Sequence, residues 1–243
     1  MVAIDAAPAL LGDLVTANRI LFNRGVVDAF GHVSVRHDRF PDRFLMARNL
    51  APAAVREEDV MAFALDGTPL GGDDRRPTLE RFIHGSIYRA RPDVGAVVHS
   101  HSPAVIPFGV VSGVPLRAIC HMSSFLGEGI PIFEIRDAAG PENDMLVRDE
   151  RLGDALARTL GASAAVLMRG HGSTAVGKDV REAVFRAVYT ELNARLQADA
   201  LRLGPTVTYL SEPEVRGATL ANQGQMARAW DLWSKERSPL IEF

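Results

Sequence analysis

The sequence predicts an α/β protein, a three-layer α/β/α domain with a mixed, largely antiparallel central sheet. Stretches whose apolar residues recur every three or four positions bracket and interrupt short apolar or alternating stretches, a pattern typical of helices around strands. Asp66-Gly67 follows one such strand and is a hairpin signal, and regular strand–helix–strand spacing is missing. We expect all 243 residues to form one domain, with a C-terminal helical extension from about residue 206.

The first part of the chain is predicted to hold two helices and three strands. Pro8 suits the start of the first helix, and Gly25 can adopt the left-handed conformation that ends it. Pro77-Thr78 begins the second helix, whose apolar residues follow a 3.6-residue period. The strands between these helices are expected at residues 33–36, 44–46 and 61–65.

The remainder of the chain combines further strands with two more helices. One helix is expected at about residues 150–160, before Gly161. Asp179 and Glu182 form a capping-box-like start to a long helix, which Gly204-Pro205 ends. The strands are expected at residues 95–101, 116–121, 130–135 and 164–168.

Composition and charge exclude several classes of protein. Lys and Arg total 27 against 30 Asp and Glu, a net charge of −3, which argues against a nucleic-acid-binding protein that neutralises phosphates. Cys120 is the single cysteine, so one chain can form neither a disulfide framework nor a thiolate metal cluster. No stretch reaches the roughly 18 consecutive apolar residues that cross a bilayer, and the first residues lack secretory features. We therefore expect a cytoplasmic protein without a membrane or nucleic-acid partner.

Three histidines lie at the ends of predicted strands. His99 and His101 are two residues apart, so they point to the same face of a strand and can reach one metal ion. His171 follows the buried strand 164–168 and lies between two glycines, which let main chain approach a site closely. Together they predict a metal site with an open coordination position, as catalytic metals have. Hydrogen-bonded polar residues at strand and turn ends are the alternative.

Glu80 is the fourth candidate. Near a helix N-terminus a carboxylate stabilises the helix dipole, which would be a purely structural role. Beside a metal ion the same carboxylate can be a ligand or can move protons. His84 lies one helical turn further on and could orient Glu80, although a core or surface histidine would have the same spacing.

Several motifs occur in a fixed order along the chain: GHVSVR (31–36), PTLE (77–80), IYRARPDV (87–94), AVVHSH (96–101) and LMRGHG (167–172). Their ordered combination, over roughly residues 10–203, closely resembles the class II aldolase/adducin family. The resemblance implies a three-layer domain with a mixed sheet. It also implies symmetric tetramers with active sites at subunit junctions.

The same resemblance implies one divalent metal ion per subunit. His99, His101 and His171 would be its ligands, and Glu80 would be an acid/base or a labile fourth ligand. Zinc, manganese, iron and cobalt all suit imidazoles with a carboxylate. No residue is assigned to an organic cofactor. Adducin-like members of the family lack the ligands and are structural modules, whereas this sequence keeps all four.

The sugar-phosphate aldolases of the family hold phosphate with small donors, and this sequence differs at those positions. His32 stands where they have an asparagine, Arg48-Asn49-Leu50 replaces a Ser-Gly pair, and Thr78-Leu79 replaces a Ser-Ser pair. An arginine suits a planar carboxylate, which it can hold through two parallel hydrogen bonds, unless Arg48 simply faces solvent. The candidate substrate-binding residues are His32, Ser34, Arg48, Asn49 and Thr78.

At these positions the sequence resembles the decarboxylase branch of the family, which acts on dihydroxyphthalate and hydroxypyridine-dicarboxylate. The resemblance implies a lyase that decarboxylates a small hydroxylated aromatic or heteroaromatic acid in a catabolic pathway. The metal would stabilise the negative charge left by carbon dioxide, and Glu80 would transfer a proton. His121, at the end of the predicted strand 116–121, could be a second proton donor or simply a histidine bonded to main chain.

Three alternatives stay open on the sequence. The first is an aldolase that cleaves a non-phosphorylated hydroxy-acid or sugar-like substrate with the same metal site. The second is a non-haem iron oxygenase, because three histidines can also hold ferrous ion. The third is a non-catalytic, adducin-like interaction module.

Overall fold

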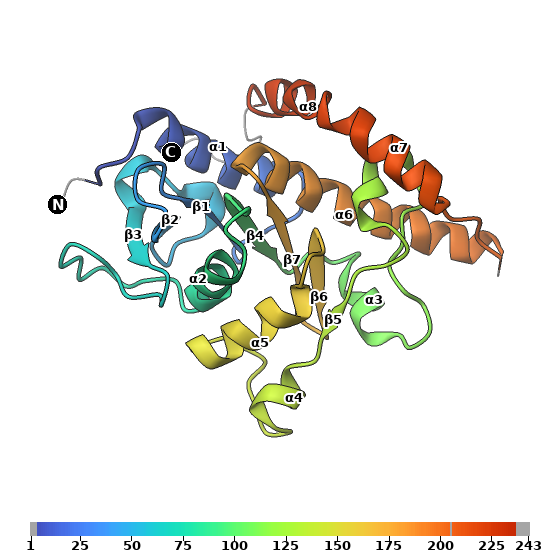
Figure 1. Cartoon of the computed structure of the whole chain (residues 1–243), viewed down its shortest axis with the longest axis horizontal. Helices are drawn as coiled ribbons and strands as arrows, with labels where there is room; N and C mark the ends of the chain where they lie inside the picture. The colour runs from blue at the N-terminus through green and yellow to red at the C-terminus, as the bar shows by residue number, and fades with distance from the viewer. Residues whose placement is uncertain (1–3, 205, 237–243) are drawn as a thin grey trace.

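The computed structural model describes residues 4–204 and 206–236, which contain one mixed sheet of seven strands. The strands are β1 (His32–Arg36), β2 (Arg43–Ala47), β3 (Val60–Ala64), β4 (Ala96–Ser100), β5 (Ile132–Phe133), β6 (Ala165–Met168) and β7 (Gly172–Gly177). They lie in the order β3-β2-β1-β4-β7-β6-β5, and every neighbouring pair is antiparallel except β5 with β6 (Figure 1). The predicted α/β class with a mixed, largely antiparallel sheet is confirmed.

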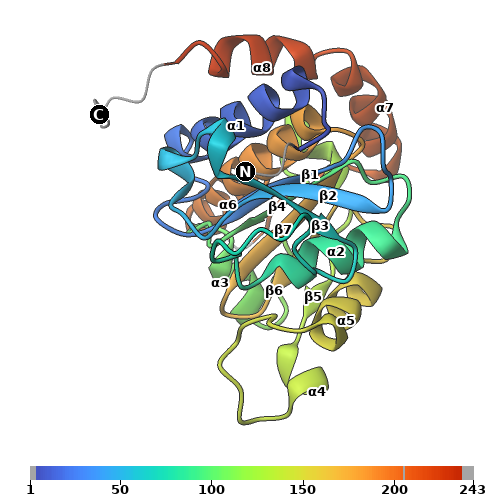
Figure 2. The ribbon, with the colours of Figure 1, turned by 90° about the vertical axis from the view of Figure 1, so that its left-hand side faces the viewer.

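Helices cover both faces of this sheet (Figure 2). On one side lie α1 (Pro8–Asn23) and α6 (Val180–Leu203), and on the other lie α2 (Arg81–Ala90) and α5 (Glu150–Leu160). The other helices are α3 (Ile106–Val110), α4 (Ile135–Ala139), α7 (Glu212–Gln223) and α8 (Met226–Trp233), with the 3-10 helices η1 (Pro52–Ala54), η2 (Glu57–Asp59) and η3 (His121–Leu126). The three predicted layers are therefore present.

Each face of the sheet has its own hydrophobic core, because side chains along a strand alternate between the faces. On β4, Val98 belongs to the core under α1 and α6, whereas Val97 belongs to the core under α2 and α5. His99 continues this alternation, so its ring lies on the side of α2. The neighbouring strands place His32 of β1 and Thr174 of β7 directly opposite His99.

Two of the helices begin in ways that matter for the site. α2 begins at Arg81 rather than at the predicted Thr78, and Glu80 occupies the N-cap position without a side-chain capping bond. The Glu80 carboxylate is therefore free to turn away from its own helix. At the start of α6 the Asp179 carboxylate accepts a hydrogen bond from the Glu182 amide, as predicted, but the Glu182 carboxylate accepts from the Lys178 amide instead of completing the box.

The prediction of a strand at residues 116–121 is wrong. The main chain there bonds to side chains of α6: the Arg117 N–H donates to Gln197 at 3.0 Å, and the Ile119 N–H donates to Asn193 at 3.0 Å. Polar side chains of a helix thus replace the neighbouring strand that a sheet would supply. The segment leads directly into η3, which begins at His121.

Other elements were predicted only in part. The strand expected at 130–135 is shortened to β5, because α4 begins at Ile135. β7 was not predicted, since its sequence GSTAVG offers few of the large apolar residues typical of strands. Its small residues nonetheless lie in the middle of the sheet, between β4 and β6.

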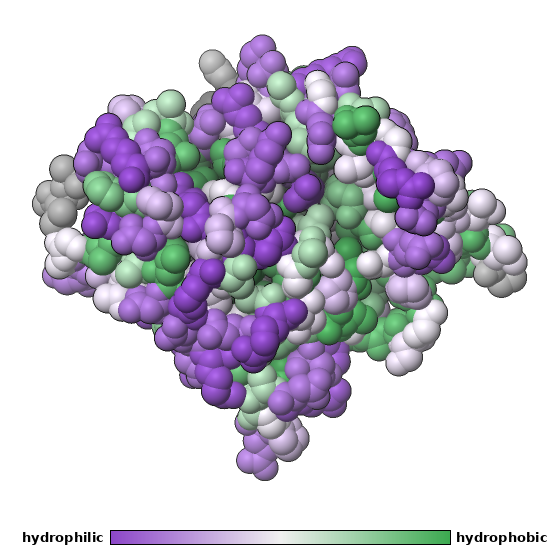
Figure 3. Space-filling view, in the orientation of Figure 1, coloured by the Kyte–Doolittle hydropathy of each residue, from purple (hydrophilic) through white to green (hydrophobic). Residues whose placement is uncertain are grey.

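The C-terminal helices lie outside α6 and η3 (Figure 1). Trp230 and Trp233 of α8 are buried in the core shared by α1 and α6. Apolar side chains gather over α3 on the face seen in Figure 3, where Val110 and Val111 are about half exposed. Within residues 4–204 and 206–236, no helix combines the length and apolar character needed to cross a membrane.

Candidate metal centre

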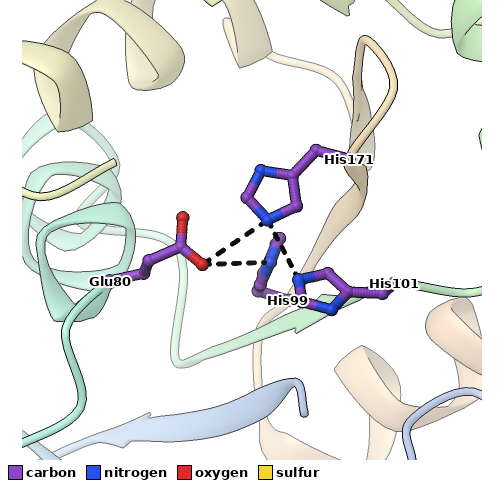
Figure 4. Close-up of side chains that lie close together, drawn as sticks. All are labelled: Glu80, His99, His101 and His171. Carbon is purple, nitrogen blue, oxygen red and sulfur yellow. Dashed lines mark hydrogen bonds and ion pairs between the residues drawn. The ribbon is translucent and has the colours of Figure 1, made fainter. Parts of the chain in front are cut away.

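Four side chains from distant parts of the sequence converge on the α2 side of the sheet. They are Glu80 at the N-terminus of α2, His99 on β4, His101 just after β4 and His171 in the turn between β6 and β7. One ligand atom of each lies within 4.8 Å of those of all the others. Figure 4 shows the carboxylate and the three rings directed toward one another. The structure thus brings together all four residues predicted as metal ligands.

The distances in this cluster suit a small cation. The Nε2 atoms of His101 and His171 are 2.9 Å apart. The Glu80 Oε2 atom lies 3.6 Å from the Nε2 atoms of both His99 and His171. Ligands bound tetrahedrally at zinc–nitrogen bond lengths are about 3.3 Å apart, so these spacings bracket the required value.

His99 supplies the observation that tests whether a metal fits. Its Nε2 atom is completely buried and has no hydrogen-bond partner among the described residues. Its Nδ1 atom lies 3.3 Å from the Thr174 hydroxyl, which donates its own proton toward the Met168 sulfur. The Nδ1 atom must therefore be the donor to Thr174, which leaves a bare lone pair on Nε2. A buried lone pair facing a carboxylate fits a metal ion, and the Thr174 bond would fix the ring for it.

The charges of the cluster also suit a cation. Burial lowers the pKa of His99 well below its ordinary value of 6.5, and burial together with His171 lowers that of His101. Neutral imidazoles are the form that binds metals. Burial opposes ionisation of Glu80, but His171, His99 and the Val147 amide outweigh it and lower its pKa to about 2. The cluster therefore presents one anionic carboxylate beside the neutral rings of His99 and His101.

The Glu80 carboxylate is held from behind. Its Oε1 atom accepts a hydrogen bond of 2.9 Å from the main-chain amide of Val147, in the segment before α5. Its Oε2 atom faces the histidines. One oxygen is thus fixed by the fold while the other remains available for chemistry.

Gly172 allows the two histidine-bearing segments to meet. It has φ +153°, and a Cβ atom there would lie 2.0 Å from the Ser100 carbonyl oxygen and 3.0 Å from the His101 Cα atom. Only glycine lets the start of β7 pack this closely on the end of β4.

Replacing Gly172 with alanine should therefore push His171 away from His101. We expect a loss of about 1–3 kcal/mol in the free energy of unfolding. We also expect zinc affinity to fall at least about tenfold, because ligand geometry is disturbed. Gly113→Ala is the matched control, since Gly113 also has a positive φ of +80° but nothing within 4 Å of its Cβ position. Equal zinc affinities in titrations of the two variants would contradict the steric explanation.

The residues predicted to bind substrate fall into two groups. Arg48, Asn49 and Thr78 lie beside the end of β2. The Thr78 hydroxyl donates to the Ala47 carbonyl at 3.2 Å, and the main-chain N–H of Asn49 donates to the Arg76 carbonyl at 2.9 Å. The Arg48 Nε atom donates to Asp59 at 2.8 Å, and its side chain is 37% exposed.

The second group, His32 and Ser34, lies on β1 on the α2 side of the sheet. The centre of the His32 ring is 4.9 Å from that of His99, so His32 adjoins the cluster without being one of its four members. Its Nδ1 atom lies 2.7 Å from the Nε2 atom of His84. Ser34 is completely buried, and its hydroxyl lies 2.6 Å from the other His84 nitrogen.

His84 does not orient Glu80, contrary to one of the sequence-based expectations. Both of its ring nitrogens are occupied, by His32 and Ser34. Tyr88, which the sequence reasoning missed, continues this contact through Ser34 at 2.7 Å. The repeated spacing of four residues from Glu80 through His84 to Tyr88 was the available signal, because it places all three on one helix face.

Acid pH is expected to destabilise the protein through His84. Burial lowers its pKa from 6.5 to about 3, so it stays neutral in the folded protein where an unfolded histidine would bind a proton. Its contribution to the free energy of unfolding is complete above pH 6.5. Below that pH the contribution falls by about 1.4 kcal/mol per pH unit, until the folded-state pKa is reached. Chemical unfolding at pH 7 and pH 5 measures this loss. His84→Gln should weaken the pH dependence, and an unchanged slope would contradict the assignment.

His121 lies apart from the four-residue cluster. It begins η3 and is exposed, and its main-chain carbonyl accepts a hydrogen bond of 2.7 Å from Asn222 of α7. The expectation that His121 ends a strand is therefore wrong, because no strand forms at residues 116–121 and His121 is the first residue of η3.

Comparison with protein families finds one match over most of the chain. The model described as the class II aldolase and adducin N-terminal domain matches residues 12–198. The decarboxylase tropJ of Talaromyces stipitatus is 38% identical over an alignment that covers 89% of this chain and 90% of the relative. A 3,4-dihydroxyphthalate decarboxylase of Arthrobacter keyseri is 28% identical over 90% of this chain and 89% of its own length.

Solved structures show the same fold. An L-fuculose 1-phosphate aldolase from Glaciozyma antarctica PI12 superposes with a TM-score of 0.75 at 24% identity, over 93% of this chain and 88% of that chain. An aldolase II superfamily protein from Pseudomonas syringae reaches a TM-score of 0.76 at 19% identity, over 94% of this chain and 93% of that chain.

Proposed function

Because the chain belongs to the class II aldolase and adducin family, we propose that it is a metal-dependent lyase that removes carbon dioxide from a hydroxylated aromatic or heteroaromatic carboxylate. The observation that carries this proposal is its 38% identity, over 89% of the chain, to the decarboxylase of Talaromyces stipitatus. The similarity to 3,4-dihydroxyphthalate decarboxylases supports an aromatic substrate, and we place the reaction in a catabolic pathway as part of this proposal.

The four-residue cluster is our proposed metal site. His99, His101 and His171 would hold the ion, and Glu80 would be a labile fourth ligand. When bound, a divalent ion supplies Lewis acidity to two adjacent oxygens, such as those of an ortho-hydroxy carboxylate. The donor set is compatible with zinc, manganese, iron or cobalt.

Glu80 is our candidate for proton transfer. Loss of carbon dioxide leaves an electron pair on a ring carbon, and a proton must take the place of the carboxylate. The fixed Oε1 atom and the open Oε2 atom of Glu80 suit a group that receives the substrate hydroxyl proton and passes it on. Its lowered pKa keeps the carboxylate ionised before the reaction, which is the form that can accept a proton.

We assign recognition of the substrate carboxylates to the residues predicted to bind substrate. Arg48 would pair with one carboxylate, and Asn49 and Thr78 beside it would add polar contacts. His32 would contact a substrate oxygen from β1, with Ser34 acting behind it. His121, exposed on η3, would be a second proton donor in a site shared between subunits of a homotetramer.

The proposal is tested by incubating the metal-reconstituted protein with dihydroxyphthalates and hydroxypyridine dicarboxylates while carbon dioxide and dissolved oxygen are measured. Release of carbon dioxide without oxygen uptake is expected. Aldehyde or pyruvate formed from hydroxy acids would instead indicate an aldolase. Oxygen uptake would indicate an oxygenase, and inactivity of the metal-loaded protein toward every substrate would contradict a catalytic role.

A further inference from the structure

A line of buried polar groups runs from the edge of the metal cluster into the protein. His32 Nδ1 lies 2.7 Å from His84 Nε2, His84 Nδ1 lies 2.6 Å from the Ser34 hydroxyl, and that hydroxyl lies 2.7 Å from the Tyr88 hydroxyl. We call His84, Ser34 and Tyr88 the Tyr88 chain. All three are at most 1% exposed. Short contacts between such groups must be hydrogen bonds, each with one donor and one acceptor.

The inner end of the Tyr88 chain determines its direction. Burial raises the pKa of Tyr88 above its ordinary value, so the phenol keeps its proton. Within residues 4–204 and 206–236, the Ser34 hydroxyl is the only acceptor bonded to that phenol. Tyr88 therefore donates to Ser34. The opposite direction would leave a phenol O–H buried without an acceptor, which proteins strongly avoid.

The donor-to-acceptor direction at Tyr88 determines that of each following hydrogen bond in the Tyr88 chain, as far as His32. Because the Ser34 oxygen accepts the hydrogen bond from Tyr88, the Ser34 hydroxyl donates its own hydrogen bond to the Nδ1 atom of His84. His84 is neutral and carries one N–H, which must then be on Nε2 and must donate to the Nδ1 atom of His32. Nδ1 of His32 is thereby an acceptor, so a neutral His32 carries its proton on Nε2.

We propose that the Tyr88 chain fixes His32 as a hydrogen-bond donor, with its proton on Nε2, toward an anionic oxygen of a molecule bound at the metal cluster. This rests on the proposed function for the identity of that molecule, a carboxylate or phenolate. The Nε2 atom has no protein partner in the described residues and is not among the completely buried unpartnered atoms. A bound oxygen can therefore reach it.

The same arrangement explains why His32 does not join the metal ligands. Its ring is only 4.9 Å from that of His99, closer than the 5.1 Å between the rings of His99 and His101. A metal ligand needs a free lone pair on nitrogen. His32 has none to offer, because Nδ1 accepts from His84 and Nε2 carries the proton. The Tyr88 chain thus separates a substrate-facing histidine from three metal-binding ones.

The test is the tautomer of His32 in the full-length protein, with and without zinc. Long-range proton–nitrogen NMR of protein labelled with ¹⁵N-histidine distinguishes a protonated Nδ1 from a protonated Nε2, and His32→Asn identifies the His32 signals. We expect Nε2–H to exceed Nδ1–H by about tenfold or more, the population ratio that one buried hydrogen bond sustains. Predominance of Nδ1–H on His32 would overturn the proposal.

Variants separate positioning from simple packing. Tyr88→Phe keeps the ring but removes the donor that sets the direction, so the two tautomers of His32 should become comparable in population. Ser86→Ala is the matched control for Ser34→Ala, because Ser86 is another buried serine on the α2 side but outside the Tyr88 chain. We expect Ser34→Ala, and not Ser86→Ala, to change the His32 signals. An unchanged His32 spectrum in folded Tyr88→Phe would contradict the proposal.

Binding provides a second readout that distinguishes this proposal from the proposed function. With zinc-loaded protein and 3,4-dihydroxybenzoate as the probe, Tyr88→Phe should weaken binding by about three- to tenfold, while Ser86→Ala should not. If decarboxylation is never observed but the tautomer is as expected, the reaction is wrong and the role of the Tyr88 chain stands. If decarboxylation is observed but the proton of His32 is on Nδ1, the proposed reaction stands and the role of the Tyr88 chain is wrong.

Discussion

Replacing His99 with alanine is expected to cause the largest loss of activity of any single substitution in this chain. It removes a completely buried nitrogen that faces the Glu80 carboxylate and has no hydrogen-bond partner, and the described residues place no fifth ligand group in the cluster. A metal contributes several kcal/mol to stabilising developing charge, so turnover should fall by roughly 10³-fold or more. Dialysed protein analysed by plasma mass spectrometry should contain far less metal than wild type.

The control for this substitution is His37→Ala. His37 is also a buried histidine, but its Nδ1 atom accepts hydrogen bonds from main-chain amides near β1, away from the cluster. It should keep full metal content per folded molecule. Full metal occupancy together with full activity in His99→Ala would show that the metal site is wrongly assigned.

Glu80→Gln is expected to have the second largest effect on activity, mainly through kcat rather than through loss of the metal. The amide oxygen of glutamine can still accept the hydrogen bond from Val147, so the segment before α5 should keep its position. The change removes the negative charge and the proton-accepting oxygen that face the histidines. We expect kcat to fall by roughly 10²- to 10⁴-fold, the usual contribution of a general acid or base, while metal affinity falls by only about 10- to 100-fold.

The chain offers a closely matched control in Glu182→Gln. Glu182 is as buried as Glu80 and also accepts a hydrogen bond from a main-chain amide, but it pairs with Arg186 on α6. Its loss should lower stability and leave kcat per folded molecule unchanged. If saturating metal restored Glu80→Gln to wild-type kcat, Glu80 would be a ligand only, without a role in proton transfer.

Much of the cluster could be predicted from the sequence because it depends on local rules. His99 and His101 share a face through strand alternation, and His171 follows a buried strand at a glycine turn. Glu80 was placed near a helix start, although α2 begins three residues later than expected. That small difference matters, because at the N-cap the carboxylate leaves the helix and reaches the histidines.

The Tyr88 chain could not be predicted in this way. It requires that His32 pair with His99, and Ser34 with Val97, which is the register between two strands separated by more than fifty residues. It also requires that α2 place His84 over both. Register between distant strands is set by the packing of the whole sheet, and no local pattern in one sequence specifies it. The prediction of a strand at 116–121 was wrong for a similar reason, since the groups that bond to this segment lie on α6, which is distant in the sequence.

That segment has a consequence for how the protein could change over evolution or in the laboratory. The α6 side chains hold it almost entirely through its peptide groups, at Pro115, Arg117 and Ile119. Peptide groups are the same whatever the amino acid, proline's missing N–H aside. Apart from Leu116 and Ala118, which are buried in the core, side chains along this stretch can therefore be exchanged while Asn193 and Gln197 keep its path. The next residue, His121, is exposed at the start of η3, so it is a position where other acids, bases or aromatic groups can be introduced without changing the path of the segment before it.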